Sequence, residues 1–549
     1  MFSKISVMAN CARLNSDAWP RLASSTFKFC LWALILIGIV ARIFPLIDPA
    51  HRLFWQYMTE DGYLMQTIAR NIALGLGMST ADGTIPTNGV QPLATFMFAV
   101  MHFIAGESKF EGIVLVTLFS VLVSIVSGYY AYKVGKNVLT ELKYGRELSM
   151  ISAALWFSAP HTIRDSMNGL ETGVYFMVLL ITLDYYLVKI SVNAKAFGLK
   201  QKLALGFLLG LCFLARNDAV FFIGGLLLAH LVLGADAAEK GYRNRLIDCL
   251  VTGITSIVVA LPWIVNNYVR FGSIMPISGL AESRNAHFAQ NLPFVPANLF
   301  SSTFIYAPVP NAFQQMPIVV MLSILWVSIA IMCFWIFVAR HTLVSRRYFL
   351  TCIIFTAGIS AFYGLFFGVP DFLHRYMAPL SPFLWLASCT AVYFFAGLFF
   401  RTFKTSRIVI TSCVLILTIG AAVFALTDFK RGYAKGTAQM HRQVVQWVQN
   451  NVPESQWVGS PQSGTLGFFH DRTLNLDGKV NPFALHAILE DGNVLEYARN
   501  SRIEYIPDWY GVAGWTEMKS NPQFGRDFKV IVRDKQLNLS VMRRIEPVQ

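Results

Sequence analysis

Long apolar stretches, separated by short loops that carry lysine and arginine, recur along most of this chain of 549 residues. Several of them exceed about 18 residues, the length that an α-helix needs to cross the hydrocarbon core of a bilayer. The composition agrees, because 55% of the residues are hydrophobic and 14% are charged, whereas an ordinary soluble domain has about 25% charged residues. The sequence therefore predicts an α-helical polytopic membrane protein and excludes disordered, collagen-like and small disulfide-stapled chains.

About eleven membrane-spanning helices are predicted from these stretches. The first, at residues 29–47, is longer than the apolar core of a cleavable signal peptide and is interpreted as a retained span. The stretch at 92–105 has about 14 residues, which suits an interfacial or re-entrant helix better than a span. The other spans are expected at residues 110–132, 148–163, 172–190, 203–216, 219–235, 247–266, 316–338, 348–367, 377–400 and 408–427.

The distribution of Lys and Arg predicts the orientation of these spans. If residues 92–105 crossed the membrane, the basic segment 133–146 would lie outside, against the tendency of basic loops to stay on the cytoplasmic side. With 92–105 in the interface, the basic loops all fall inside and the N-terminus is cytoplasmic. The net charge of +14 then belongs to cytoplasmic loops, so nucleic acid is not expected as a partner. We expect a multi-pass protein of the inner (cytoplasmic) membrane.

Function is expected on the outer side, because two long loops and the C-terminal region lie there. The first loop covers residues 48–110 and the second about 267–315. After residue 427 the composition becomes mixed, which predicts a transmembrane domain at 1–427 and a soluble, extracytoplasmic α/β domain at 428–549. The elements expected in this second domain are a helix near 440–450 and strands at 473–476, 503–506 and 529–532.

Two adjacent carboxylates, Glu60 and Asp61, stand at the start of a predicted helix in the first outer loop. Apolar residues between 63 and 74 follow the helical period, so both acids fall at the helix N-terminus, where the helix dipole alone would favour them. The functional interpretation is that an acid at the level of the lipid headgroups acts as a general base on an incoming hydroxyl. A single Glu–Asp pair offers too few ligands to require a divalent cation, although it is compatible with one. No other metal site is predicted, since no pair of the eight cysteines has metal-ligand spacing.

Other polar residues near the predicted membrane boundary each have a structural and a functional interpretation. Glu171 begins a span, where its charge also suits a helix N-terminus. Arg216 and Asp218 lie in a short turn between two spans and form, most simply, a local ion pair. Arg375 lies at the outer start of a span, and its forked donors are suited to a lipid phosphate. Its side chain could equally extend to the lipid headgroups.

The order of these motifs resembles that of the polyprenyl-phosphate-sugar-dependent glycosyltransferases of the GT-C fold. The resemblance covers most of the chain. It rests on Glu60-Asp61 followed by Ala69-Arg70-Asn71 and Gly75-x-Gly77, on Asn88-Gly89-x-x-Pro92-Leu93, on Gly169-Leu170-Glu171-Thr172, on Arg375-Tyr376-x-x-Pro379, and, in the C-terminal region, on Gly464–Phe469 and Asp477–Pro482.

The resemblance implies a membrane glycosyltransferase, with a GT-C-like transmembrane domain, that moves a hexosyl or pentosyl group from a polyprenyl-phosphate donor. Its acceptor would be an extracytoplasmic glycan, lipid or protein. Asp61 corresponds to the catalytic base, and Glu60 replaces the first Asp of the family. Arg375, with His374, would hold the donor phosphate. The other residues expected to bind substrate are Arg70, Asn88, Gln91, Glu171, Arg216, Asp218 and Tyr376.

Three functions are compatible with the sequence at this stage. A glycosyltransferase acting by a single displacement would invert the anomeric centre. A lipid-linked sugar translocase or transporter also needs many spans and phosphate-binding arginines, but the charges here gather in the outer loops rather than in the middle of the spans. A non-catalytic protein of envelope assembly would keep the fold without the activity, and it would tolerate Asp61→Asn.

Overall fold

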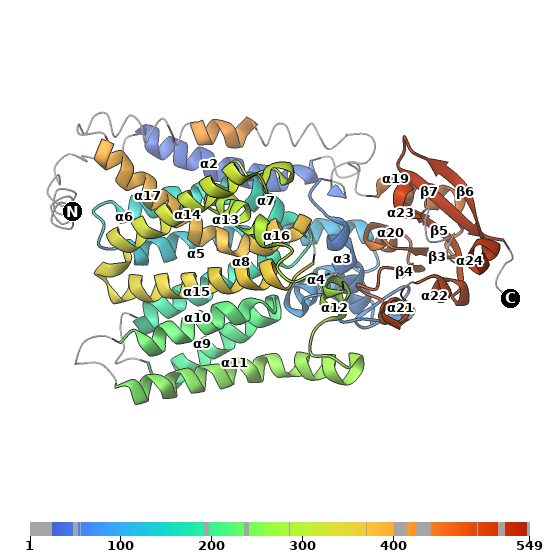
Figure 1. The fold of residues 1–549 in the computed structure, drawn as a ribbon, viewed down its shortest axis with the longest axis horizontal. Helices are drawn as coiled ribbons and strands as arrows, with labels where there is room; N and C mark the ends of the chain where they lie inside the picture. Colours follow the sequence, from blue (N-terminus) through green and yellow to red (C-terminus); the bar gives the residue numbers. More distant parts are fainter. Residues whose placement is uncertain are drawn as a thin grey trace.

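The computed structural model of the protein shows a bundle of helices at one end and a smaller α/β domain at the other (Figure 1). Three short helices of the outer loops, α3 (Glu60–Ala73), α4 (Pro92–Ala105) and α12 (Ile277–Ser283), lie between the two. We describe residues 25–47, 53–54, 56–191, 197–234, 241–284, 286–368, 370–399, 413, 416–423, 441–490, 492, 494–513 and 522–545.

Helices run along the bundle over most of the predicted spans. Seven segments of the described chain are long and apolar enough to cross a membrane. Two further helices match predicted spans but are shorter, with 17 residues in α9 and 14 in α10, and α6, with 14 residues, covers part of the span predicted at 148–163. The last predicted span, 408–427, falls mostly outside the described residues. The bundle helices are α2 (Ser25–Ile43), α5 (Lys109–Val138), α6 (Gly145–Ser158), α7 (Pro160–Met167), α8 (Thr172–Tyr185), α9 (Leu199–Ala215), α10 (Ala219–Val232), α11 (Tyr242–Phe271), α14 (Pro317–Phe337), α15 (Leu343–Leu365), α16 (Leu373–Met377) and α17 (Ser381–Phe399).

One predicted span is wrong as a continuous helix. The segment 148–163 breaks at Ala159, which has an extended backbone (φ −67°, ψ 138°), and a new helix, α7, begins at Pro160. The break has a local cause, since proline disfavours the helical conformation in the residue before it and suits the first turn of a helix. The chain therefore leaves α6 and changes direction close to the outer loops.

The outward faces of the bundle are apolar. Helix α14, for example, exposes five large apolar side chains in its first half, each more than half accessible: Ile318, Met321, Leu322, Ile324 and Leu325. A continuous surface of this kind would associate in water but matches the hydrocarbon of a bilayer. The helices and their apolar faces make this a multi-pass membrane protein.

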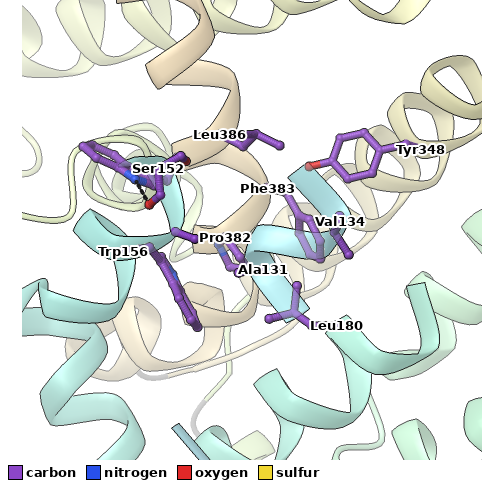
Figure 2. A pocket seen from close by; sticks show the side chains of 11 residues that line it. Ala131, Val134, Ser152, Trp156, Leu180, Tyr348, Pro382, Phe383 and Leu386 are labelled. Atoms are coloured by element: carbon purple, nitrogen blue, oxygen red, sulfur yellow. Dashed lines mark hydrogen bonds between the residues drawn. The ribbon is translucent and has the colours of Figure 1, made fainter. Parts of the chain in front are cut away.

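The interior of the bundle is closely packed and contains a small cavity of about 10 Å³, room for about one water molecule. Figure 2 shows side chains that line it, among them Trp156, Tyr348 and Phe383. Ser152 and Tyr348 supply hydroxyl groups, but no charged side chain lines the cavity. The indole of Trp385 donates a hydrogen bond to the carbonyl of Ser152 at 3.0 Å, which joins α17 to α6. This cavity therefore lacks the charges that a sugar phosphate needs.

The outer loops form the short helices that the sequence predicts. Helix α3 (Glu60–Ala73) begins at the two carboxylates, and α4 (Pro92–Ala105) has the bounds expected for the interfacial helix. Between them lies a two-stranded antiparallel sheet of β1 (Ser79–Thr80) and β2 (Ile85–Pro86). The second outer loop contains α12 (Ile277–Ser283) and α13 (Val295–Thr303).

The C-terminal region is the α/β domain that its composition predicts. Its five strands have the order β4-β3-β5-β7-β6, with β3 parallel to β4 and β5, and β7 antiparallel to β5 and β6. Helix α20 faces the outer loop helix α3 (Figure 1). The elements are α19 (Arg442–Asn451), β3 (Trp457–Ser460), α20 (Gly464–Phe469), β4 (Thr473–Asn475), α21 (Pro482–Glu490), α22 (Leu495–Asn500), β5 (Ile503–Asp508), α23 (Tyr510–Ala513), α24 (Pro522–Asp527), β6 (Phe528–Asp534) and β7 (Leu539–Arg544).

Candidate active site

The first turn of α3 is held tightly against the turn between α7 and α8. Thr59 caps the helix, because its hydroxyl accepts a hydrogen bond from the Gly62 amide at 3.0 Å. The Thr59 amide and hydroxyl both donate to the carbonyl of Asn168, each at 3.1 Å. A Cβ atom at Gly62 would lie 2.1 Å from that carbonyl oxygen, so only glycine permits this approach. The local sequence thus fixes the position of the two carboxylates next to the start of α8.

Asp61 lies between two cations that come from different parts of the chain. Nη1 of Arg375, on α16, donates to Oδ2 of Asp61 at 2.7 Å. Nζ of Lys479, in the C-terminal domain, lies 4.0 Å from Oδ1. Lys479 also pairs with Glu282 on α12, at 2.7 Å between Nζ and Oε1. The bundle and the C-terminal domain therefore meet the first outer loop at the Asp61 carboxylate, and the second outer loop joins them through Lys479.

These cations determine the protonation state of Asp61. Burial alone would raise the pKa of Asp61, but the positive charges of Arg375 and Lys479, together with the hydrogen bond from Arg375, lower it below its ordinary value. The Asp61 side chain is therefore ionised at neutral pH. Burial lowers the pKa of Lys479, but its acidic neighbours, Asp61 first, raise it above the ordinary value. Lys479 is therefore positively charged beside Asp61.

Glu60 has a different environment from Asp61, although it precedes it directly. Its carboxylate accepts hydrogen bonds from the amides of Gly464 and Thr465, the latter at 3.1 Å, and from the Thr465 hydroxyl, all at the start of α20. Burial is the main cause that raises the pKa of Glu60 to about 8. Glu60 therefore joins the first outer loop to the C-terminal domain, and its carboxylate does not share the cations of Asp61.

Arg216 and Asp218 form the local ion pair that their turn predicts. The hydroxyl of Tyr363 donates to Oδ2 of Asp218 at 2.8 Å. Nη2 of Arg216 also donates to the carbonyl of Tyr376 at 3.4 Å, and Nε lies 4.0 Å from Oε1 of Glu171. Arg216 therefore contacts the backbone of the segment that carries Arg375, and Asp218 holds Arg216 in place.

The two residues beside Arg375 have different environments. Tyr376 stacks on Tyr363, with ring centroids 4.6 Å apart and planes 14° apart, and its hydroxyl lies 3.3 Å from Nη2 of Arg375. His374 is exposed, and its Nδ1 lies 3.0 Å from the carbonyl oxygen of Asp371. Tyr376 is thus part of the group around Arg375, whereas His374 faces solvent at its edge.

The other predicted substrate residues lie where the outer loops contact their neighbours. Arg70 pairs with Asp471 of the C-terminal domain at 3.3 Å, and Lys109 pairs with the same carboxylate at 2.9 Å. Oδ1 of Asn88 accepts a hydrogen bond from the Ile277 amide at 3.1 Å, which ties the first outer loop to α12. Gln91 precedes α4, and its buried Oε1 has no hydrogen-bond partner within the described part of the chain. Arg70 and Asn88 therefore connect segments around Asp61.

Two residues of this site were not predicted from the sequence as site residues. Lys479 belongs to the segment Asp477–Pro482 that carries the resemblance, so the motif was visible although its lysine had no assigned role. Glu282 lies in a part of the second outer loop without any recognised motif. Lys479 reaches Asp61, and Glu282 reaches Lys479, only when the three segments pack together.

In this structure the Glu60–Asp61 pair is not arranged around a shared ligand. The two carboxylates have separate partners, Glu60 at α20 and Asp61 at Arg375 and Lys479. Among the residues that the structure describes, no group of three or more His, Cys, Asp and Glu side chains is arranged to hold a metal ion. A metal site here would need these contacts to rearrange, and no chemical step below depends on one.

The fold is that of the GT-C glycosyltransferases. The structure is similar to the oligosaccharyltransferase AglB from Archaeoglobus fulgidus, solved with an inhibitory peptide and a dolichol-phosphate, at 12% identity over 92% of this chain and 73% of that one, with a TM-score of 0.54. It is equally similar to ArnT from Cupriavidus metallidurans in the apo state, at 13% identity over 94% and 97% of the two chains and a TM-score of 0.55. The A. fulgidus enzyme in complex with Zn and sulfate matches at 14% identity, over 91% and 71%, with a TM-score of 0.54.

Comparison by sequence adds one match, in the C-terminal domain. Residues 431–539 match a family described as a domain of unknown function, DUF8728. No curated protein matches the sequence significantly.

The candidate spans and the similarity to the solved structures together define the chain as a membrane protein with the GT-C fold.

Proposed function

We propose that this protein is an integral membrane glycosyltransferase that moves a sugar from a polyprenyl-phosphate donor to an extracytoplasmic acceptor. The observation that carries the proposal is the ionised Asp61 carboxylate, held beside Arg375 in the first outer loop of a GT-C fold. A base and a phosphate-binding cation are the two groups that this transfer needs. The acceptor is a glycan, a lipid or a protein with a free hydroxyl or comparable nucleophile.

The transfer is a single displacement at the anomeric carbon. A hydroxyl of the acceptor attacks this carbon and gives its proton to an oxygen of Asp61. The bond between the anomeric carbon and the phosphate oxygen breaks, and its electron pair stays on the phosphate. Asp61 loses one negative charge while the departing polyprenyl phosphate gains one. The configuration of the anomeric carbon inverts.

Arg375 has a role in both halves of this reaction. Its guanidinium binds the donor phosphate and stabilises the charge that develops when the sugar leaves. In the structure the same guanidinium bonds to Asp61 and contributes to its low pKa. When the phosphate takes over part of this bonding, the pKa of Asp61 rises, so Asp61 becomes a stronger base only when the donor is bound.

The proposal places the protein in the inner (cytoplasmic) membrane, with the N-terminus cytoplasmic and the C-terminal domain outside. Its partners are then the polyprenyl-linked donor, membrane lipids and the extracytoplasmic acceptor. The orientation is supported by the basic loops, all of which fall on the side opposite α3 and Asp61 under the predicted topology. The donor phosphate would enter at the headgroup level, where Arg375 lies near the start of the candidate span Pro370–Ala396.

The test is the transfer of labelled sugar from a panel of synthetic polyprenyl-phosphate sugars by the purified protein, with donor hydrolysis followed as well. Asp61→Asn keeps the size of the side chain but removes the base, so turnover is expected to fall by about 100- to 10,000-fold. The matched control is Asp82→Asn, which removes a half-exposed carboxylate from the same outer loop. Equal activity of wild type and Asp61→Asn, or a product with retained configuration, would contradict the proposed mechanism.

A further inference from the structure

Lys479 is the only group of the C-terminal domain, among the described residues, whose charged atom is paired with Asp61. It approaches Oδ1 of Asp61, whereas Arg375 bonds to Oδ2. The aromatic ring of Phe372 lies beside both cations, with its centroid 5.1 Å from Cζ of Arg375 and 5.5 Å from Nζ of Lys479. Two cations from two domains thus converge on the same small region.

We propose that Lys479 is a second ligand of the donor phosphate, so that the C-terminal domain supplies part of the donor site. This inference rests on the proposed function and deepens it. The ligand chemistry is a phosphate ester: Arg375 binds it from the bundle and Lys479 from the opposite side. The C-terminal domain is then a component of the active site in addition to a cover for it.

The contacts of Lys479 do not use all of its hydrogen-bond donors. An ammonium group has three N–H donors. Within the described residues, Nζ of Lys479 makes one contact of hydrogen-bond length, to Glu282 at 2.7 Å, and its 4.0 Å separation from Asp61 is too long for a hydrogen bond. Its side chain is 21% exposed, so it is not fully enclosed by the surrounding segments. A phosphate oxygen could therefore accept a hydrogen bond that Asp61 does not.

Two cations can share the charge of the transferred phosphate. Within this group, Asp61 and Glu282 pair with Arg375 and Lys479, and Asp477 is a further carboxyl group close to Lys479. A bound phosphodiester adds one negative charge before transfer. During transfer a second negative charge forms on the phosphate as Asp61 becomes protonated. A single arginine would face this doubly charged phosphate alone, whereas two cations can each neutralise one charge.

The backbone around Lys479 is built to hold this side chain in place. Asn475 accepts a hydrogen bond from the Gly478 amide at 3.0 Å, and Asp477 accepts one from the Lys479 amide at 2.9 Å. Gly478 has a φ of +84°, a conformation that other residues rarely adopt. The next residue, Val480, is buried in the hydrophobic core of the transmembrane domain. The turn at 477–480 is therefore anchored in the bundle while it belongs to the C-terminal domain.

Gly89 of the first outer loop explains how this turn comes so close. A Cβ atom at Gly89 would lie 2.1 Å from the carbonyl oxygen of Lys479, so a side chain there would push the turn away from Asp61. Two glycines in separate motifs, Gly89 and Gly478, are thus required for one contact. This dependence supports a specific position for Lys479 rather than a chance approach of two surfaces.

The experiment measures binding of undecaprenyl phosphate to the full-length protein in nanodiscs, with undecaprenol and inorganic phosphate as comparison ligands. Wild type is expected to bind undecaprenyl phosphate more tightly than undecaprenol. Lys479→Gln is expected to raise the Kd by about 10- to 100-fold, the effect of losing one charge-assisted hydrogen bond. Lys479→Arg keeps a cation and should stay within about threefold of wild type by the same reasoning. The matched control is Lys529→Gln, which removes an exposed lysine from β6 of the same domain and should leave the Kd unchanged.

Glu282→Gln provides a second, independent variant in case Lys479→Gln loosens the domain contact. It keeps Lys479 and removes the anion that neutralises it, so the Kd for undecaprenyl phosphate should fall by about two- to tenfold. A rise in that Kd would overturn the electrostatic argument. Thermal melting of each variant shows whether the fold is retained.

The outcomes separate this inference from the proposed function. If Arg375→Gln weakens binding but Lys479→Gln does not, Lys479 is not a phosphate ligand, and the proposed function stands. If wild type binds undecaprenyl phosphate no better than undecaprenol, the lipid-phosphate donor is refuted and both proposals fall. If only inorganic phosphate binds in a Lys479-dependent way, the site takes a soluble phosphate and the lipid donor is again refuted.

Discussion

The two sides of the first turn of α3 differ sharply, although they belong to adjacent carboxylates. On one side Glu60 contacts backbone amides of α20, and burial raises its pKa to about 8. On the other side Asp61 contacts Arg375 and Lys479, and these cations keep its pKa below the ordinary value. Successive residues of a helix point about 100° apart, so one turn can serve two surfaces. The sequence motif presents the two acids as a pair, but their environments differ. Glu60 connects the first outer loop to the C-terminal domain, whereas Asp61 lies beside the cations Arg375 and Lys479.

The largest expected difference between the two sides is in catalysis. Asp61→Asn should reduce kcat by about 100- to 10,000-fold, because the general base is lost. Glu60→Gln should reduce it less than about tenfold, because the amide oxygen still accepts a hydrogen bond from α20. Both are measured in the sugar-transfer assay. An equally large loss of kcat in Glu60→Gln would mean that the two acids act together in catalysis, and would contradict the separate roles given to them here.

The next expected effect concerns the pH dependence of the Asp61 side. Removal of the positive charge in Arg375→Gln should raise the pKa of Asp61, because this charge helps to keep it low. Asp61 must be ionised to accept a proton, so the acid limb of the pH profile of kcat/KM should move to higher pH. The donor KM should also rise. A profile with an unchanged acid limb would show that Asp61 is not the group that titrates.

On the Glu60 side, pH should change stability rather than catalysis. The pKa of Glu60 is about 8 in the folded protein against an ordinary 4.5, so the folded state binds more protons between these two values. Stability from this group therefore falls as the pH rises from 4.5 to about 8. Thermal melting at several pH values should show this fall in wild type and a smaller one in Glu60→Gln. If the stability of both proteins fell equally with pH, a group other than Glu60 would be responsible for the fall.

The smallest effect is expected for the ion pair between Arg70 and Asp471. The Asp471 side chain is 44% exposed and that of Arg70 is 13% exposed, and Lys109 also pairs with Asp471, so we expect a contribution close to that of an exposed ion pair, about 0–1 kcal/mol. Arg70→Gln should therefore lower the free energy of unfolding only slightly and leave the donor KM within about threefold of wild type. A much larger rise in KM would show that Arg70 binds substrate, as the motif predicts. The substrate-binding residues would then include residues of α3 beyond its first turn.

Elements that depend on local sequence were predicted well. Helix α4 has the expected bounds, 92–105, and α3 covers the apolar period between 63 and 74 apart from its last residue. The exception, 148–163, failed because Pro160 interrupts an apolar stretch whose hydropathy alone looks continuous. Apolar periods and proline act over a few residues, so they can be read without the fold.

The sequence by itself determined the class of protein and the α/β nature of the C-terminal region, and it singled out Asp61 and Arg375 as candidate site residues. Hydropathy, basic loops and the order of motifs carry that information along the chain. Only the tertiary structure decided that Glu60 and Asp61 have separate partners, that Lys479 lies beside Asp61, and that Glu282 pairs with Lys479. The reason is physical: charges distant in sequence influence a pKa or bind one ligand only when packing brings them within a few ångströms, and the close approaches at Gly62, Gly89 and Gly464 make that packing possible.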